Sequence, residues 1–303
     1  MALKDIKSAI AAKLRTNKVT RAMEAVSAVK MRKTQVAAIA DRAYARAAVS
    51  ILARLSGSSD VKRHPLAEAR PVKKLALVVI TSDKGLAGAL NSSVLKEAAH
   101  AAAGRTPADV TVYAYGRKGN EYFSRRGYRV AKAVENKRDE IPLSVMEEFA
   151  GEVASGFLAG EFDEAAVIYS NFKSTFEQVA TRRTLLPLSL ETVEKIVHDI
   201  VPEKGRFSDA AAIAAPVTYT VEPSAEAVVG ALVPRLVAVM LYHMLLESKA
   251  SEHSARMVAM KNASDKSKEV ARELTRKYNK IRQAAITREV SEIVSGREAL
   301  ATH

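Results

Sequence analysis

The stretch "KLALVVITSDKGLAGALN" (74–91) says most about the fold, because an apolar run passes directly into a turn with two glycines. Residues 74–80 predict a buried strand, and "SSVLKEAAHAAA" (92–103) predicts the helix that follows. This is the layout of a phosphate-binding loop. However, Gly85 and Gly88 fit neither GxxxxGK[ST] nor GxGxxG. The pattern therefore favours a tight structural turn over a nucleotide site.

The segment around this turn, residues 70–220, alternates between predicted strands and helices. Strands are expected at 74–80, 109–116, 164–172 and 175–188, and helices at 92–103, 117–127 and 144–159. This alternation is typical of a small open α/β sheet of Rossmann-like kind. Asp83 is expected to cap the helix after the turn. Pro202, Gly205 and Pro216 predict a loop over 202–216.

Two long helices are predicted at the ends of the chain. Residues 1–56 contain neither proline nor glycine, and 233–295 contain only Pro234, which could start or kink a helix. The apolar stripes are Leu3, Ile6, Ile10, Leu14, Val19, Met23, Val26 and Val29 in the first helix, and Leu236, Met240, Val270, Leu274, Tyr278, Ile281 and Ala285 in the second. Helices this long need a partner along their length, so an antiparallel coiled coil is expected. The predicted domains are a helix at 1–57, a globular domain at 70–220 and a helix at 224–296.

The positive charge is concentrated in these helices. The chain carries a formal net charge of +13, of which 1–54 contribute +9 and 249–289 contribute +6. Cysteine is absent, which excludes disulfides, thiolate metal sites and thiol nucleophiles. We find no apolar run near the roughly 20 residues of a membrane span, so a soluble protein of a reducing compartment is expected.

The sequence offers no catalytic constellation. It contains no HExxH and no GxSxG, and its six histidines form no metal-ligand pattern. We therefore expect no catalytic residue, no cofactor and no metal. One interpretation is nucleic-acid binding by the basic helices, although they carry few aromatic side chains for base stacking. A second is a rigid rod inside an acidic protein sleeve, and a third is a solvated coil without a partner.

Three motifs favour the rod. "TRAMEAVSAVKMRKTQ" (20–35), "TSDKGLAGALN" (81–91) and two segments near the C-terminus, "ASEHSARMVAMKNASDKSKEV" (250–270) and "YNKIRQAAITREVSEIVSG" (278–296), resemble the gamma subunit of F-type ATP synthase. The resemblance covers essentially the whole chain. It implies a central rotor stalk without catalytic activity, which transmits rotation of the c-subunit ring to three alpha and three beta subunits. It also implies contact with the epsilon subunit, and it argues against nucleic acid as a partner.

The resemblance also implies contact residues. Those expected to face the alpha and beta subunits, including an acidic lever of beta, are Lys18, Arg21, Met23, Lys30, Arg32, Lys33, Lys84, Arg256, Arg282, Gln283 and Thr287. Met23 could instead lie in the coiled-coil seam, and Arg256 could pair with the N-terminal helix. The foot region expected to meet epsilon and the c ring contains Tyr169, Phe172 and Phe176.

The expected location follows from the same resemblance. No transit peptide precedes the first helix, so we expect a peripheral protein on the cytoplasmic face of a bacterial inner membrane, held there through the c ring. A mature mitochondrial chain is the alternative. The cysteine-bearing insertion of the chloroplast form is absent, which excludes thiol regulation of that type.

Overall fold

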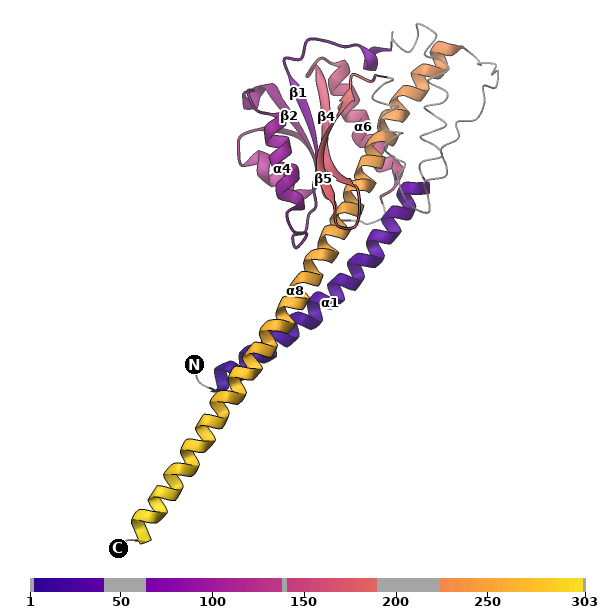
Figure 1. Cartoon of the computed structure of the whole chain (residues 1–303). Helices are drawn as coiled ribbons and strands as arrows, with labels where there is room; N and C mark the ends of the chain where they lie inside the picture. The colour runs from indigo at the N-terminus through magenta and orange to yellow at the C-terminus, as the bar shows by residue number, and fades with distance from the viewer. Residues whose placement is uncertain (1–2, 41–63, 138–140, 190–223, 302–303) are drawn as a thin grey trace. The chain divides into compact units, whose positions relative to one another are not determined.

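The structure, a computed structural model, describes residues 3–40, 64–137, 141–189 and 224–301 (Figure 1). The chain divides into two compact units: Ala28–Ala255 form one, and Met1–Ser27 with Arg256–His303 form the other. The predicted loop at 202–216 lies outside the described residues, as does the predicted helix beyond Ala40. The domain limits proposed from the sequence stay a prediction.

The first unit is built on a five-stranded sheet in the order β3-β2-β1-β4-β5. The strands are β1 (Leu75–Ile80), β2 (Val110–Tyr115), β3 (Arg129–Val134), β4 (Glu164–Phe172) and β5 (Gln178–Leu186). Neighbouring pairs among β3, β2, β1 and β4 are parallel, and β5 is antiparallel to β4. The predicted Rossmann-like α/β sheet is therefore confirmed.

Helices cover both faces of this sheet (Figure 1). Side chains of β1 alternate between two apolar clusters, one shared with α4 (Leu90–Ala101) and α5 (Arg117–Ser124) and the other with α6 (Leu143–Leu158) and α8 (Ala225–Ala301). Every residue of β1 is buried, because a parallel strand covered on both faces meets no solvent. This explains the unbroken apolar run from which the strand was predicted.

The strand β3 was not predicted from the sequence. β3 lies at the edge of the sheet, where its residues alternate between exposed and half-buried positions. Its sequence, "RVAKAV", is interrupted by two charged residues, Arg129 and Lys132, and so lacks the apolar run of the inner strands. The pairing shifts between Val112 and Tyr113 of β2, which leaves Ala131 without a pairing partner there. Such irregularity at an edge discourages pairing with another chain.

The helix α8 has an apolar beginning that the sequence analysis overlooked. Within the described part of the chain, one helix, Glu226–Arg297, is long enough and apolar enough to cross a membrane. It meets this test by length and composition alone, and one window of the helix has a mean hydropathy of 1.8. The expectation that no apolar run approaches this length is therefore wrong. Most of the window, 61%, is buried, and Val237, Leu241 and Leu245 pack in the sheet core. A core helix passes the same test. The helix also runs through Pro234 without ending.

The second unit is a pair of helices. Residues 3–27 of α1 (Leu3–Ala40) run antiparallel to the part of α8 beyond Arg256 (Figure 1). The two are joined by Asn17, whose Nδ2 donates to the carbonyl oxygen of Ser264 at 2.7 Å and to its Oγ at 2.8 Å. The predicted antiparallel coil is confirmed for these residues.

The buried face of α1 differs from the predicted one. Ile6, Thr20, Ser27 and Thr34 are buried, and the last three are spaced seven residues apart. By contrast, of the eight residues predicted for the stripe only Ile6 is buried, and half are solvent-exposed, including Val19, Val26 and Val29 at 54–69%. Ser and Thr are small and, within a helix, their hydroxyls bond to carbonyls of the preceding turn, as Thr20 and Thr34 do here. Small side chains allow close helix contact, and the valines are left outside.

Candidate partner-binding surfaces

The turn after β1 is closed by its own side chains. Asn91 accepts a hydrogen bond from the Ser82 backbone N–H at 3.0 Å and donates to Ser82 Oγ at 2.7 Å. Ser82 Oγ in turn donates to the Lys84 carbonyl at 2.7 Å. Ser82 is thus fully engaged inside the turn, and Lys84 is left exposed beyond it.

Asp83 caps a helix, but a different one from that predicted. Its Oδ1 accepts from the backbone N–H of Arg117 at 2.6 Å, and Arg117 is the first residue of α5. The expectation that Asp83 caps the following helix is therefore wrong, since α4 has no side-chain cap. Asp83 and Arg117 are 34 residues apart, so sequence proximity gave no sign of the contact.

The backbone of the turn is unusual at Leu86. Gly88 has a φ of 58°, as expected of a glycine, but Leu86 has a φ of 64°. It is the one non-glycine residue with positive φ among those the structure describes. Its side chain is 62% exposed. The turn therefore presents an apolar side chain and the Lys84 cation to the outside.

The carboxyl edge of the sheet is covered by α8. Ser251 Oγ donates to the Ser170 carbonyl in β4 at 3.0 Å, and Lys249 Nζ donates to the carbonyl of Asn136, just past β3, at 3.0 Å. In open α/β sheets, ligands bind outside the carboxyl ends of the strands. Side chains of α8 stand at that position here, which agrees with the absence of a nucleotide motif in the turn.

A surface groove of about 470 Å³ lies along α6 and the edge strand β3. Its carboxylates are paired: Lys132 contacts Glu148 and Glu152, and Arg129 contacts Glu161 at 3.3 Å. Burial lowers the pKa of Lys132, but its bonds to the two glutamates outweigh this and raise it overall. The carboxylates that line the groove are therefore engaged in ion pairs with cations of β3. No group of three or more His, Cys, Asp or Glu could hold a metal among the described residues.

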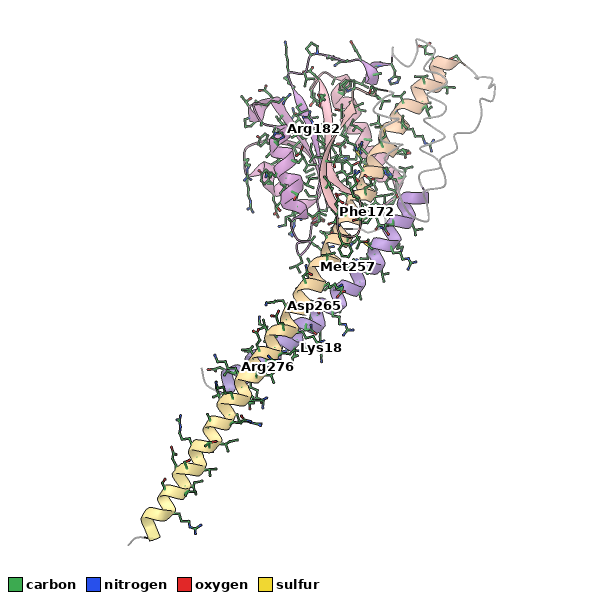
Figure 2. All side chains as sticks on the ribbon, viewed as in Figure 1. Lys18, Phe172, Arg182, Met257, Asp265 and Arg276 are labelled. Carbon is green, nitrogen blue, oxygen red and sulfur yellow. The ribbon has the colours of Figure 1, made fainter. Side chains whose placement is uncertain are left out.

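Most of the predicted contact residues for alpha and beta lie on the surface. Lys18, which Figure 2 labels on α1, is exposed, and Arg256 is buried at 8% exposure. Met23 and Lys30 are half-buried. The exposed members of the set are Lys18, Arg21, Arg32, Lys33, Lys84, Arg282, Gln283 and Thr287. The positions stay predictions as contacts, but eight of the eleven have the exposure that a contact needs.

The three foot residues have different environments. Tyr169 is 1% exposed and its hydroxyl accepts from Arg183 Nε at 3.0 Å, so it has no surface to offer and we do not retain it as a contact. Burial, and then the charge of Glu247, raise its pKa well above the usual value. Phe172 is half-buried where β4 ends (Figure 2), and Phe176 is 81% exposed at the tip of the β4–β5 hairpin.

Two exposed apolar faces are additional candidates. The first is the valine face of α1, defined as Val19, Val26, Val29 and Val36. The second is the tip face of α8, defined as Ile286, Val290, Ile293 and Val294, at 49–71% exposure. Spacings of three, four and seven put each set on one side of its helix. Val19, Val26 and Val29 were expected in the coiled-coil seam. Periodicity shows that a helix has an apolar side, but it does not show which neighbouring element packs against that side.

Comparison with known proteins identifies the family. The family model described as "ATP synthase" matches residues 2–300. The chain is 43% identical to the ATP synthase gamma chain of Roseiflexus castenholzii over 289 residues, which is 93% of each chain. It is 39% identical to that of Chlorobium phaeobacteroides over 304 residues, 98% of each chain. The chain belongs to the ATP synthase gamma family.

Solved structures agree with this membership. A central-stalk chain of the Tetrahymena thermophila mitochondrial ATP synthase superposes with a TM-score of 0.60 at 27% identity, covering 81% of this chain and 99% of that one. A chain of the Euglena gracilis mitochondrial enzyme reaches a TM-score of 0.66 at 16% identity. The match covers 98% of this chain and 94% of that one, which shows the shared fold. The chain is thus a central-stalk subunit of an F-type ATP synthase, a complex associated with membranes.

Proposed function

We propose that the chain is the non-catalytic rotor shaft of a proton-translocating ATP synthase. Rotation of a c-subunit ring would turn the α/β unit, and α8 with α1 would carry that rotation into a ring of three alpha and three beta subunits. The stalk's lack of symmetry would then drive the three catalytic sites through different conformations. The Tetrahymena relative comes from a central stalk and c-ring assembly, which supports this arrangement.

The observation that carries the proposal is the pair of apolar faces on helices rich in cations. Val26 and Val29 are 54% and 69% exposed, and exposed cations such as Lys18 and Lys33 flank them. Contiguous exposed apolar surface marks a site of interaction with another protein. A surrounding sleeve with apolar walls and acidic groups would satisfy both features, as alpha and beta subunits would.

The remaining parts of the proposal follow from the family. The chain itself would hold no ATP and catalyse no reaction. Its partners would be alpha, beta, epsilon and the c ring, with no nucleic acid. The complex would lie on the cytoplasmic face of a bacterial inner membrane, and the bacterial relatives support this location.

Reconstitution tests the proposal. The chain is mixed with cognate alpha and beta subunits, and the product is sized and assayed for ATPase. A complex of one chain with three alpha and three beta, and ATPase above that of alpha and beta alone, is the expected result. No complex, together with duplex DNA binding that persists at physiological salt, would favour the nucleic-acid interpretation instead.

A charge variant tests the contact residues. Lys18→Gln, Arg21→Gln and Arg282→Gln together should weaken assembly or coupled synthesis and leave thermal unfolding unchanged, because all three are exposed. The matched control is Lys96→Gln, Lys118→Gln and Arg125→Gln, which removes three exposed or half-buried cations from α4 and α5 and their surroundings. Equal effects of the two triple variants would count against the assigned contacts.

The partner that we propose for Phe176 differs from the one expected from the sequence. β1 and β4 are parallel neighbours, with Val79 opposite Ile168, so the Lys84 turn and the Phe176 hairpin both lie past the same edge of the sheet. We therefore propose that Phe176 meets the same partner as Lys84, namely beta, rather than the c ring. A photo-crosslinking residue at Phe176 should capture beta in the assembled complex, and capture of epsilon or c would reverse the assignment.

A further inference from the structure

Two sides of α8 are hydrogen-bonded to the rest of the Ala28–Ala255 unit. On one side, Tyr242 Oη donates to the carbonyl of Ile141 at 3.0 Å. Seven residues, or about two helical turns, later, Lys249, which is 2% exposed, donates to the carbonyl of Asn136 at 3.0 Å. Both acceptors belong to the segment between β3 and α6.

The other side of α8 is bonded to β4 and its hairpin. Ser251 Oγ donates to the Ser170 carbonyl at 3.0 Å, and Ser254 Oγ donates to the Thr175 carbonyl at 2.6 Å. Ser251 is fully buried.

A chain of side chains extends the contact on this second side. Burial, and then the charge of Glu247, raise the pKa of the Tyr169 hydroxyl, which accepts a hydrogen bond from Arg183 in β5 at 3.0 Å. His243 Nε2 lies 3.3 Å from Glu247 Oε1. The carboxylate of Glu247 therefore influences a tyrosine of β4 that is bonded to β5.

Helix geometry separates the two sets of contacts. At about 100° per residue, positions 242 and 249 point within about 20° of each other, and 251 and 254 lie within about 60° of each other. The mean directions of the two sets differ by roughly 150°. The α/β unit thus holds α8 from nearly opposite sides.

We propose that these contacts form a torsional clamp, which makes α8 rotate with the α/β unit. The clamp is defined as Tyr242, Lys249, Ser251 and Ser254 with their partners. Close packing of the apolar side chains in the same core also resists rotation of the helix, and the hydrogen bonds add a resistance that depends on angle. Hydrogen bonds depend on angle, so a turn of α8 would break bonds on both sides at once and leave buried carbonyls unsatisfied. The inference rests on the proposed function, because a clamp matters where rotation is transmitted.

The clamp is tested by the torsional stiffness of the assembled complex. The chain has no native cysteine, so a single Lys96→Cys on α4 can carry a bead while the alpha–beta ring is fixed to a surface and stalled. The variance of the bead angle then reports the twist between the α/β unit and the held part of α8. We expect the variance to rise at least about twofold in Ser251→Ala/Ser254→Ala and in Tyr242→Phe/Lys249→Met.

Two control variants separate a clamp from simple stabilisation. Val237→Ala removes fully buried packing from the same helix but touches no polar contact. Thr275→Val removes a hydroxyl that bonds only within α8, to the Ala271 carbonyl. Both controls should raise the variance less than the clamp variants do, whatever their melting temperature. Clamp variants that match Val237→Ala in variance, at equal loss of melting temperature, would overturn the proposal.

A second measurement needs no partner. Spin labels at Lys96→Cys and Ala231→Cys, both exposed, report the width of the distance distribution between α4 and α8 in the full chain. The width should increase in the clamp variants, and in the milder Ser251→Ala alone, but less in Val237→Ala. An unchanged width would reject the clamp even if the wild-type chain fails to assemble, whereas a failure of assembly with a changed width would reject only the rotor function.

Discussion

At the residue scale, Gly116 is required by geometry. Its φ is 116°, and a Cβ added there would lie 2.0 Å from the Thr81 carbonyl oxygen. We expect Gly116→Ala to lower the free energy of unfolding by about 4 kcal/mol or more, since backbone would have to move. Gly104→Ala is the control: it shares a positive φ of 79° but meets no atom within 4 Å, so only about 1 kcal/mol should be lost. Urea unfolding measures the free energy of unfolding of both variants. Similar losses of free energy in the two would contradict the steric argument.

Asp163 gives a pH-dependent prediction. Its Oδ2 accepts from the backbone N–H groups of Lys73 and Lys74, each at 2.9 Å. The Lys74 bond lowers its pKa most, burial opposes this, and the Lys73 bond adds to the lowering. Because the folded pKa is below the unfolded value of 3.8, the stabilisation is fully present above 3.8 and is lost as the pH falls through the folded value.

Asp163→Ala should therefore cost about 1 kcal/mol at neutral pH, a modest value because the site is partly exposed. The difference in unfolding free energy between wild type and variant should shrink as the pH is lowered below about 3.8. Urea unfolding at several pH values measures it. A difference that stays constant into acid would mean that the charge of Asp163 is irrelevant.

Sequence patterns located these residues only in part. The strand–turn–helix around Asp83 was predicted correctly, because its apolar run and glycines are local signals. That Asp83 caps α5 and that Gly116 contacts Thr81 depend on β1 and β2 being neighbours. Contacts between residues more than 30 positions apart leave no mark in a single sequence.

At the element scale, Asn17 sets the pairing of α1 with α8. A polar residue bonded across a helical interface fixes the register of the pair. Asn17→Ala should cost about 1 kcal/mol and speed amide hydrogen exchange in residues 3–27 of the full chain. Thr16→Ala is the control, since Thr16 bonds only to the Ala12 carbonyl within its own exposed turn. Equal exchange in the two variants would show that the Asn17 contact does not hold the pair.

The elements also show why helix faces are harder to predict than helices. The absence of glycine and proline predicted long helices, and α8 is indeed one helix of 77 residues. The face of α1 that packs carries Thr20, Ser27 and Thr34, which a search for apolar periodicity passes over. The edge strand β3 was missed for a similar reason, because its exposed side chains carry no apolar signal.

At the scale of the whole molecule, the valine face should matter for assembly and not for folding. Val26→Gln/Val29→Gln should leave the free energy of unfolding within about 0.5 kcal/mol of wild type, because both side chains are exposed. Affinity for the alpha–beta ring should fall at least about tenfold, since two apolar side chains lose their burial. Val72→Gln/Leu158→Gln removes two other exposed apolar groups and should not affect assembly. Quantitative sizing at several concentrations measures both, and unaltered affinity would place the valine face outside the interface.

The position of α8 across the sheet edge has a consequence for how this α/β domain can be used. A freely diffusing ligand at such an edge would bind reversibly. The fraction of sites that it occupies would then depend on the ligand concentration. Here the occupant is part of the same polypeptide, so its effective concentration is set by the chain and does not fall on dilution. A small molecule would have to displace a covalently tethered competitor before it could reach Ser170 or Asn136. The carbonyls of these two residues at the sheet edge are therefore bonded to α8 of the same chain at any protein concentration.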